Sequence, residues 1–397
     1  MRNTMMRLGA LALFLSATSG CMATDTRDGG EEVGSAEEAV TLTKKTIALT
    51  TGIQMAYQEM GDPNGAPVIF LHGYTDTSRS FYPTLQALLG LNNHLHIYAL
   101  DQRGHGASSM PSEASCAASP GDCFRPADLA GDVVAFMNAK GISKATIVGH
   151  SMGSFVAQEL GLTHACRVES VVLIGTGARL AGNVVLNDFI LAEPVEGSWK
   201  AGFEAQGYAF PSGVYNLTPM DANADAEAWI AGGWVVDPAA NPAFLADILP
   251  ETEATRMGTW VGAAHGLLDT DNRQRLKHFS VPALVLWATE DAIFYDTDEQ
   301  ELRDALDVAV SHCKTEYYFK QYGKRPLSPD GLQLDDIGHN TQWGAPNEVA
   351  RDVDSWMRHG RPTKDWYYSA DGDPQTIVTQ KNAAPILHKT QPKSCKK

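Results

Sequence analysis

Positive charge is scarce in this sequence. Its 31 lysine and arginine residues face 47 aspartates and glutamates, which gives a formal net charge of −16 at pH 7. Nucleic acid binding needs a basic surface against the phosphates, so this balance argues against a nucleic acid partner. The sequence also lacks any uninterrupted apolar run of ~20 residues that could cross a bilayer, and it has no internal repeat. The chain has 397 residues, 44% of them hydrophobic, which is enough for one large domain or two medium ones.

Residues 1–20 have the layout of a bacterial export signal. Arg2 and Arg7 supply the positive start, residues 8–15 form a short apolar run, and small residues lead to Cys21. We therefore predict that this segment directs export and does not belong to the fold. The Ser-Gly-Cys ending resembles that of a lipoprotein signal, which predicts lipidation of Cys21. Ordinary cleavage and release is the alternative.

Residues 21–40 are acidic and rich in small side chains. They cannot bury a core, and they are predicted to form a flexible tether. We expect an exported protein that is anchored to a membrane of the bacterial cell envelope through its N-terminal lipid. Without the lipid it would be periplasmic or secreted. This anchor is the only membrane contact that we expect.

The six cysteines are compatible with disulfides, because an exported chain enters an oxidising compartment. Cys116 and Cys123 flank a Ser-Pro-Gly-Asp turn, and a local bridge between them is predicted. Cys166, Cys313 and Cys395 can supply one further bridge, whose pairing stays open. No histidine or cysteine cluster has the close spacing of a zinc site, so no metal and no cofactor are predicted.

Short apolar runs alternate with helical patterns along most of the chain. This alternation is typical of a mostly parallel sheet with helices on both faces, and we predict an α/β fold with about eight strands. Residues 41–177 and 279–360 are predicted to form this core. The strands are expected at 45–49, 53–58, 68–71, 97–100, 145–148, 170–174, 281–287 and 315–319, and the helices at 81–89, 124–139, 152–162, 298–308 and 347–358.

Residues 178–278 interrupt this rhythm. A segment of about a hundred residues is too long for a loop, and we predict an inserted helical cap. It contains four tryptophans, which are expected mainly in its core, although a lid over the active site would also set specificity. Residues 361–397 form a C-terminal extension for which the sequence predicts no placement.

The sequence Gly149-His150-Ser151-Met152-Gly153 carries the chemistry. It follows the predicted strand at 145–148 and opens the predicted helix at 152–162, as a nucleophile elbow requires. The glycines allow a sharp turn that exposes the Ser151 hydroxyl above the sheet. The helix N-terminus behind the serine favours developing negative charge. We therefore predict that Ser151 is a nucleophile.

Four motifs in order resemble the α/β-hydrolase superfamily over roughly residues 45 to 360. Leu71-His72-Gly73-Tyr74 looks like its oxyanion loop, and Asp101-Gln102-Arg103-Gly104-His105-Gly106 looks like the turn after its fourth strand. The elbow and Gly338-His339, which looks like the late histidine loop, complete the order. The likeness is strongest to enol-lactonases, cofactor-free haloperoxidases and carbon–carbon bond hydrolases.

The resemblance implies a catalytic triad. Asp291 follows the strand at 281–287 and matches the acid position, where it would orient the histidine and stabilise its charged form. His339 would take the proton from Ser151 and deliver it to the leaving group. Glu290, Asp296 and Asp298 are read as solvated carboxylates.

The resemblance also implies an oxyanion hole and separates the other histidines. The backbone N–H groups of Tyr74 and Met152 are expected to form the hole. His72, His105 and His150 belong to other motifs, where such residues usually pack or hold loops, and His265 lies in the inserted segment.

The leading hypothesis for function is hydrolysis of a small-molecule ester or lactone through an acyl-serine intermediate. Epoxide hydrolases and haloalkane dehalogenases of this superfamily usually carry aspartate at the elbow, and Ser151 argues against both. Carbon–carbon bond hydrolysis and perhydrolysis use the same triad and stay open. A non-catalytic binding protein on this fold is the alternative from a different class.

Overall fold

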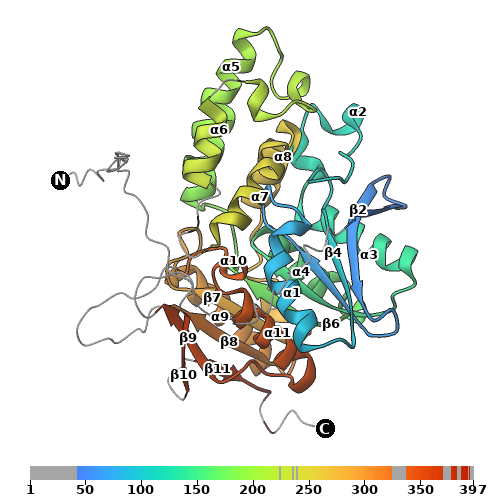
Figure 1. Ribbon diagram of the computed structural model, residues 1–397, viewed down its shortest axis with the longest axis vertical. Coiled ribbons are helices and arrows are strands. Elements are labelled where there is room, and N and C mark those ends of the chain that lie inside the picture. The colour runs from blue at the N-terminus through green and yellow to red at the C-terminus, as the bar shows by residue number, and fades with distance from the viewer. Residues whose placement is uncertain are drawn as a thin grey trace, which may run out of the picture. The chain divides into compact units, whose positions relative to one another are not determined.

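The computed structural model describes residues 43–222, 225–234, 237, 240–323, 337–369, 377–381, 386–391 and 393 (Figure 1). The predicted export signal, Cys21 and the acidic tether lie outside the described residues. Within these ranges, no helix has the length and apolar character that crossing a membrane requires.

The described strands form one eleven-stranded sheet with the order β1-β2-β4-β3-β5-β6-β7-β8-β9-β10, in which β11 also pairs with β8. The strands from β4 to β8 are parallel, and β1 and β2 form an antiparallel hairpin at one edge. The strands are β1 (Lys45–Ala48), β2 (Gln54–Gly61), β3 (Ala66–Leu71), β4 (Leu95–Leu100), β5 (Ala145–His150), β6 (Val168–Ile174), β7 (Ala283–Ala288), β8 (Tyr317–Tyr322), β9 (Asp365–Ser369), β10 (Ile377–Lys381) and β11 (Ile386–Lys389).

Both faces of the sheet are buried, which explains why its central strands are continuous apolar runs. On β3, Val68 and Phe70 pack in one cluster with α1 and α11, while Ile69 and Leu71 pack in the other with α3, α4 and α9. The helices and short turns of this core are η1 (Ser78–Phe81), α1 (Tyr82–Leu91), α2 (Glu113–Cys116), η2 (Pro120–Cys123), α3 (Pro126–Lys140), α4 (Met152–Thr163), η3 (Ala165–Arg167), η8 (Leu276–His278), α9 (Asp296–Ser311), α10 (Thr341–Gly344) and α11 (Pro346–His359).

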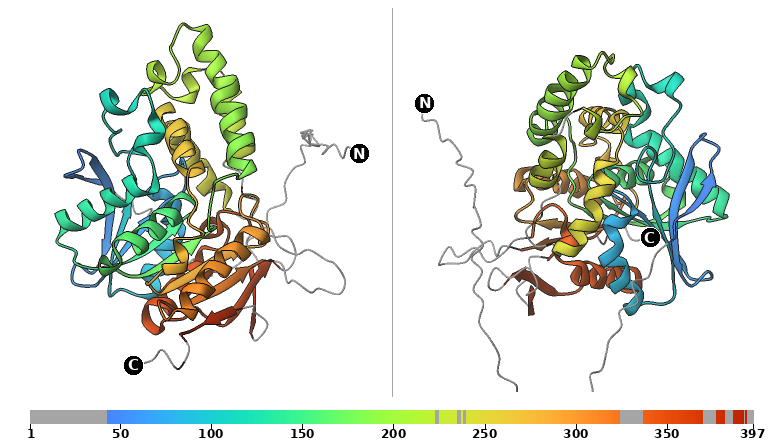
Figure 2. Two further views of the ribbon diagram at one scale, coloured as in Figure 1. Left: turned by 180° about the vertical axis from the view of Figure 1, so that it is seen from behind. Right: turned by 45° about the horizontal axis from the view of Figure 1, so that its top comes forward.

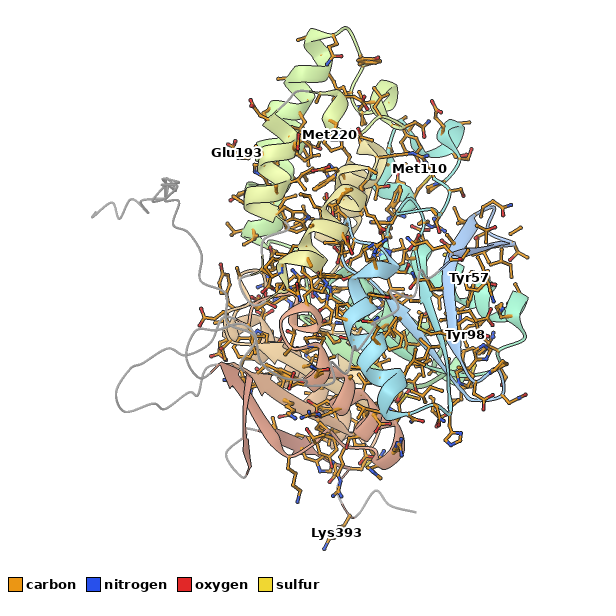
Figure 3. The ribbon with its side chains drawn as sticks, viewed as in Figure 1. Tyr57, Tyr98, Met110, Glu193, Met220 and Lys393 are labelled. Atoms are coloured by element: carbon orange, nitrogen blue, oxygen red, sulfur yellow. A yellow bond between two sulfur atoms is a disulfide. The ribbon has the colours of Figure 1, made fainter. Side chains whose placement is uncertain are left out.

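The antiparallel edge of the sheet carries an aromatic cluster (Figure 3). Tyr57 of β2 and Tyr98 of β4 have ring centroids 6.3 Å apart, and both rings contact Phe136 of α3 edge-on. The Lys140 ammonium lies 5.1 and 5.3 Å from the two tyrosine centroids. Such contacts add to area burial, and they fasten the last turn of α3 to the hairpin.

The inserted segment between β6 and β7 forms a helical layer, coloured light green to yellow in Figures 1 and 2. Trp199 and Trp260 are fully buried there, with ring centroids 5.0 Å apart. The expectation that these tryptophans lie in the core of the segment therefore fits these two. Its helices are η4 (Val185–Trp199), α5 (Lys200–Ala205), η5 (Ser212–Val214), η6 (Pro219–Asp221), α6 (Asp225–Trp229), η7 (Ile230–Trp234), α7 (Pro242–Glu253) and α8 (Met257–Leu268).

The C-terminal extension differs from the expectation, because it continues the sheet. β9 pairs in parallel with the end of β8, β10 pairs antiparallel with β9, and β11 lies antiparallel along β8. These three strands raise the strand number above the expected eight. Their sequence alone did not identify them, because a short strand at a sheet edge is specified by the strand it pairs with.

A buried ion pair holds the start of this extension against the sheet. The Lys320 ammonium of β8 donates to the Asp352 carboxylate of α11 at 2.8 Å, and both side chains are fully buried. The Thr363 N–H and hydroxyl donate to the same carboxylate oxygen at 2.8 and 2.7 Å. Additional hydrogen bonds of this kind are needed to offset the desolvation of two buried charges. The network thereby directs the chain from α11 toward β9.

Three of the four described cysteines, Cys116, Cys123 and Cys313, are disulfide-bonded, so Cys313 takes part in a further bridge as expected. The Sγ atoms of Cys116 and Cys123 lie at bonding distance, 2.04 Å, across the turn that contains η2. Cys166 is exposed and carries a free thiol.

Candidate active site

Ser151 lies at a sharp turn between β5 and α4. Its backbone φ is +50°, in a region that only a few per cent of non-glycine residues occupy. A Cβ atom on Gly149 would approach the Gly153 carbonyl oxygen to 2.2 Å, and one on Gly153 would approach the Leu71 carbonyl oxygen to 2.0 Å. Both positions therefore exclude any side chain, and the tight backbone approach holds Ser151 in its strained conformation.

Asp291 lies in the loop after β7 and is 4% exposed. Its Oδ1 atom accepts hydrogen bonds from the N–H groups of Ile293 and Phe294 at 2.8 and 2.9 Å. Its Oδ2 atom lies 2.9 Å from Nδ1 of His339. The two backbone donors fix the carboxylate plane, so the second oxygen is held in place for the imidazole.

The three other carboxylates of this region are placed differently. Asp298 accepts a hydrogen bond from the N–H of Tyr295 at the start of α9, and the Asp296 side chain is 82% exposed. Glu290 is exposed, as expected for a solvated loop carboxylate, and it also lines the cavity that contains Ser151.

His339 lies beside Ser151 in the same cavity. Its Nε2 atom is buried and has no hydrogen-bond partner, while Nδ1 contacts Asp291. Burial lowers the pKa of His339, but the charge and hydrogen bond of Asp291 outweigh burial, and the charges of Asp76 and Asp237 add to them. The net shift is upward from 6.5. Catalytic hydrogen bonds are often long before substrate binds, so an unpaired Nε2 is compatible with a general base.

The remaining motif histidines hold loops, as the sequence predicted. His72 contacts the Gly73 carbonyl at 2.8 Å and accepts the N–H of Gln102 at 2.9 Å, and burial lowers its pKa to about 3. His105 contacts the Arg103 carbonyl at 2.9 Å, and burial lowers its pKa to about 4. Both rings are therefore neutral.

Two further histidines make different contacts, His150 beside the loop of His339 and His265 within the inserted segment. His150 Nε2 lies 3.1 Å from the His339 carbonyl oxygen, so this ring supports the loop that carries the candidate base. His265 of α8 lies 2.7 Å from Glu196 of η4 and ties two elements of the inserted segment together.

The residues expected at the oxyanion hole flank the serine. Met152 is the first residue of α4, where helix N–H groups lack an intrahelical acceptor. Tyr74 follows β3 and lines the cavity with Ser151. Its hydroxyl donates to the Trp260 carbonyl at 2.6 Å, which fixes the loop to the inserted segment.

The cavity at Ser151 has a volume of about 240 Å³, which suits a small molecule. The inserted segment supplies part of its wall, as a specificity lid would. The lining residues are Gly73, Tyr74, Asp76, His150, Ser151, Val185, Phe189, Gly233, Trp234, Asp237, Glu290, Ala292, Ile293, Gly338, His339, Asn340 and Trp343.

Two aspartates of this cavity were missed in the sequence. Asp76 follows the oxyanion-loop motif by two residues, so its position near the site could have been inferred. Asp237 comes from the inserted segment, and its Oδ2 atom accepts the N–H of Asn340 at 3.2 Å. No local pattern marks it, because its position depends on how the inserted segment folds over the sheet. Across the described ranges, no group of three or more His, Cys, Asp and Glu side chains is arranged to hold a metal ion.

The model of the alpha/beta hydrolase fold family matches residues 66–316, more than half of the chain. The chain therefore belongs to this family, and the predicted fold class is confirmed. It is similar to the enol-lactonase of Burkholderia xenovorans, with a TM-score of 0.54, 21% identity and coverage of 79% of this chain and 100% of that one. At this identity, the likeness shows the fold alone.

Two curated relatives are similar to parts of the sequence. Epoxide hydrolase A of Mycobacterium tuberculosis is 35% identical over 130 residues, which cover 32% of this chain and 37% of that protein. 3-Oxoadipate enol-lactonase 2 of Acinetobacter baylyi is 24% identical over 265 residues, which cover 66% of this chain and 83% of that protein. The chain thus spans little more than a third of the length of the epoxide hydrolase it matches.

Proposed function

We propose that the protein is a serine hydrolase that cleaves a small-molecule ester or lactone through an acyl-serine intermediate. One observation carries the proposal: the Asp291 carboxylate lies 2.9 Å from His339 Nδ1, and His339 shares a cavity with the strained Ser151. Membership of the alpha/beta hydrolase fold family supports it.

The mechanism assigns one role to each group. The Ser151 hydroxyl attacks the substrate carbonyl while His339 Nε2 takes its proton, and Asp291 stabilises the imidazolium without taking that proton. The backbone N–H groups of Tyr74 and Met152 hold the negative charge of the tetrahedral intermediate. His339 then protonates the leaving alcohol, and a water molecule, activated by the same imidazole, releases the acid.

The nucleophile at the elbow distinguishes this chain from epoxide hydrolases, to which part of its sequence is similar. The superfamily resemblance implies aspartate at the elbow of such enzymes, whereas this chain has Ser151. A serine nucleophile forms an acyl ester with a carbonyl substrate, and water can hydrolyse that ester. This chemistry favours esters and lactones over epoxides.

The test uses wild-type protein and Ser151→Ala side by side. Wild type should hydrolyse short-chain nitrophenyl esters and be labelled by a fluorophosphonate probe, and the variant should lose both. A screen of esters, lactones and amides on both proteins would then identify the acyl group. Wild-type protein that is neither labelled nor active on any ester or lactone would overturn the proposal in favour of a binding protein.

We also propose that the protein is exported and anchored to a cell-envelope membrane through lipid on Cys21. The signal-like residues 1–20 and the acidic segment after them support this. Cys21→Ala should move the protein from the membrane fraction to the soluble fraction. Cys166→Ala, which removes an exposed free thiol, is the control and should leave the distribution unchanged. A Cys21→Ala protein that stays with the membrane contradicts the anchor.

A further inference from the structure

One histidine that lines the active-site cavity, His150, has a ring nitrogen without a hydrogen-bond partner. His150 is 1% exposed, and its Nε2 atom lies 3.1 Å from the His339 carbonyl oxygen. A carbonyl only accepts, so Nε2 carries the proton of this neutral ring and Nδ1 carries a lone pair. Nδ1 is buried and has no hydrogen-bond partner. An unmet buried acceptor is costly, which points to a ligand that brings a donor.

A carboxylate faces the same gap. Asp76 Oδ2 lies 3.9 Å from His150 Nδ1, which is too long for a direct hydrogen bond, and it accepts the Ser80 hydroxyl at 3.0 Å. A Cβ atom on Gly73 would lie 2.9 Å from Nδ1 and 3.1 Å from Asp76 Oδ2. A side chain at position 73 would therefore displace one of these two groups, and glycine keeps both in place.

Further acidic residues line the cavity. Asp237 and Glu290 line it as well, and the described lining residues include no lysine or arginine. A cleft lined by one sign of charge concentrates ligands of the opposite sign. This wall disfavours a substrate that carries a carboxylate.

The inserted segment adds an aromatic wall. Trp234 and Phe189 line the cavity, and the Trp234 ring lies 5.8 Å from that of Tyr74. Indole and phenyl faces attract cations through their quadrupole. The wall therefore suits an organic cation, whose alkyl part is apolar and whose head is charged.

We propose that the cavity binds a protonated amine, so that the ester or lactone cleaved at Ser151 carries an ammonium group. This inference rests on the proposed function. The ammonium N–H groups donate to His150 Nδ1 and to the Asp76 carboxylate, and the aromatic wall covers the adjoining alkyl chain. A primary or secondary amine fits better than a quaternary one, because the unmet His150 Nδ1 atom requires an N–H donor.

Binding of the cation is coupled to the proton on Asp76. Burial raises the pKa of Asp76 to about 7, the charges of His339 and Glu251 also act on it, and the neutral His150 ring faces it at 3.9 Å. An ammonium beside the carboxyl favours its ionised form. Affinity for the amine should therefore rise as the pH is raised from about 6 to 8, as Asp76 loses its proton.

The kinetic test uses three nitrophenyl esters of matched length: 6-aminohexanoate, heptanoate and the half-ester of adipate. They place an ammonium nitrogen, a methyl carbon or a carboxylate oxygen the same number of bonds from the ester carbonyl. We expect kcat/KM to be about tenfold or more higher for the ammonium ester than for heptanoate, and lowest for the adipate ester. An ammonium ester that is cleaved no faster than heptanoate overturns the inference and leaves the proposed function standing.

Two variants that each lose one negative charge test whether Asp76 causes the preference for the ammonium ester. Asp76→Asn should lower the ratio of ammonium to heptanoate kcat/KM to about threefold or less, while Asp188→Asn should keep the wild-type ratio. Asp188 is exposed on η4 and loses the same charge outside the cavity lining. Circular dichroism reports whether Asp76→Asn is folded. Equal ratios in the two variants overturn the assignment to Asp76.

Calorimetry on wild-type protein separates binding from catalysis. Hexylammonium should bind at least about tenfold more tightly than hexanol, and hexanoate should bind more weakly than either. Hexylammonium that binds no tighter than hexanol contradicts the amine site. If no ester is cleaved and Ser151 is not labelled, the proposed function fails, and this calorimetric comparison still decides whether the cavity takes an amine.

Discussion

The loop after β7 and the loop after β3 each place an aspartate whose charge acts on His339, and the two surroundings differ. Asp291 meets two backbone N–H groups and the imidazole, so each of its oxygens has a donor. Asp76 accepts the Ser80 hydroxyl and lies 3.9 Å from a nitrogen lone pair, and burial raises its pKa to about 7. Hydrogen bonds to both oxygens fix the Asp291 carboxylate beside the imidazole. The Asp76 carboxyl, whose pKa is near neutral, is able to change its protonation state when a ligand binds.

The same comparison extends to the chain segments that carry the two residues. The loop after β7 fixes Asp291 with its own backbone N–H groups, and the Asn183 amide of the inserted segment donates to its Ile293 carbonyl at 2.8 Å. The loop after β3 contacts the inserted segment through the Tyr74 hydroxyl and the Trp234 Nε1–H, which donates to Thr75 Oγ1 at 2.7 Å. Both loops thus contact the inserted segment, while the Asp291 carboxylate is also fixed by two N–H groups of its own loop. We therefore expect the two aspartates to respond differently to substitution.

The largest effect is expected at the imidazole that the two aspartates share. His339→Ala should lower kcat/KM for a nitrophenyl ester by about 10⁴-fold or more, because Ser151 loses its general base. His265→Ala is the control, since that ring pairs with Glu196 in the inserted segment, and it should stay near wild type. Retained activity in His339→Ala would sink the triad assignment.

Asp291→Asn should come next, with a loss of roughly 10³- to 10⁴-fold. The amide presents a donor or a weaker acceptor to Nδ1, so the imidazole is held in the wrong tautomer and its charged form loses its partner. Steady-state kinetics beside Asp298→Asn, whose carboxylate caps α9, would measure this. Equal losses in the two variants would show that Asp291 has no special role.

The pH dependence of the wild type tests the charge that both aspartates place on His339. Its pKa is raised above 6.5, and the protonated ring cannot accept a proton from Ser151. Activity is therefore lost as the pH falls through a midpoint above 6.5. A profile of kcat/KM against pH with a midpoint below 6.5 contradicts the arrangement.

Asp76→Asn should produce the smallest change for a neutral ester. Removing this carboxyl removes one of the charges that raise the pKa of His339, so the acidic midpoint should move to lower pH by less than about one unit. The measurement is the same profile on the heptanoate ester, with Asp188→Asn as the matched loss of charge. An unchanged midpoint would mean that Asp76 does not act on the imidazole.

Much of the fold could be predicted from the sequence, because its signals are local. Val68 to Leu71 is an apolar run and Ala145 to Val148 is apolar except for Thr146; both are buried, and Gly141 ends α3 with φ of +70° as a helix stop should. The C-terminal strands could not be predicted in this way. They extend the sheet by pairing with β8 and with each other, so their formation depends on a partner that lies elsewhere in the chain.

The candidate site also combines features that neighbouring residues determine with features that only tertiary contacts determine. The turn at Ser151 follows from its own neighbourhood, since only glycine tolerates the backbone approaches at 149 and 153. The sequence by itself therefore determined the elbow, the strand and helix around it, and the order of the candidate triad. Tertiary structure alone decided that Asp291 and His339, 48 residues apart, meet at 2.9 Å, and that Asp76 and Asp237 share their cavity. Adjacent residues determine the steric constraints on a turn, whereas contacts between distant loops form only after the sheet and the inserted segment have packed together.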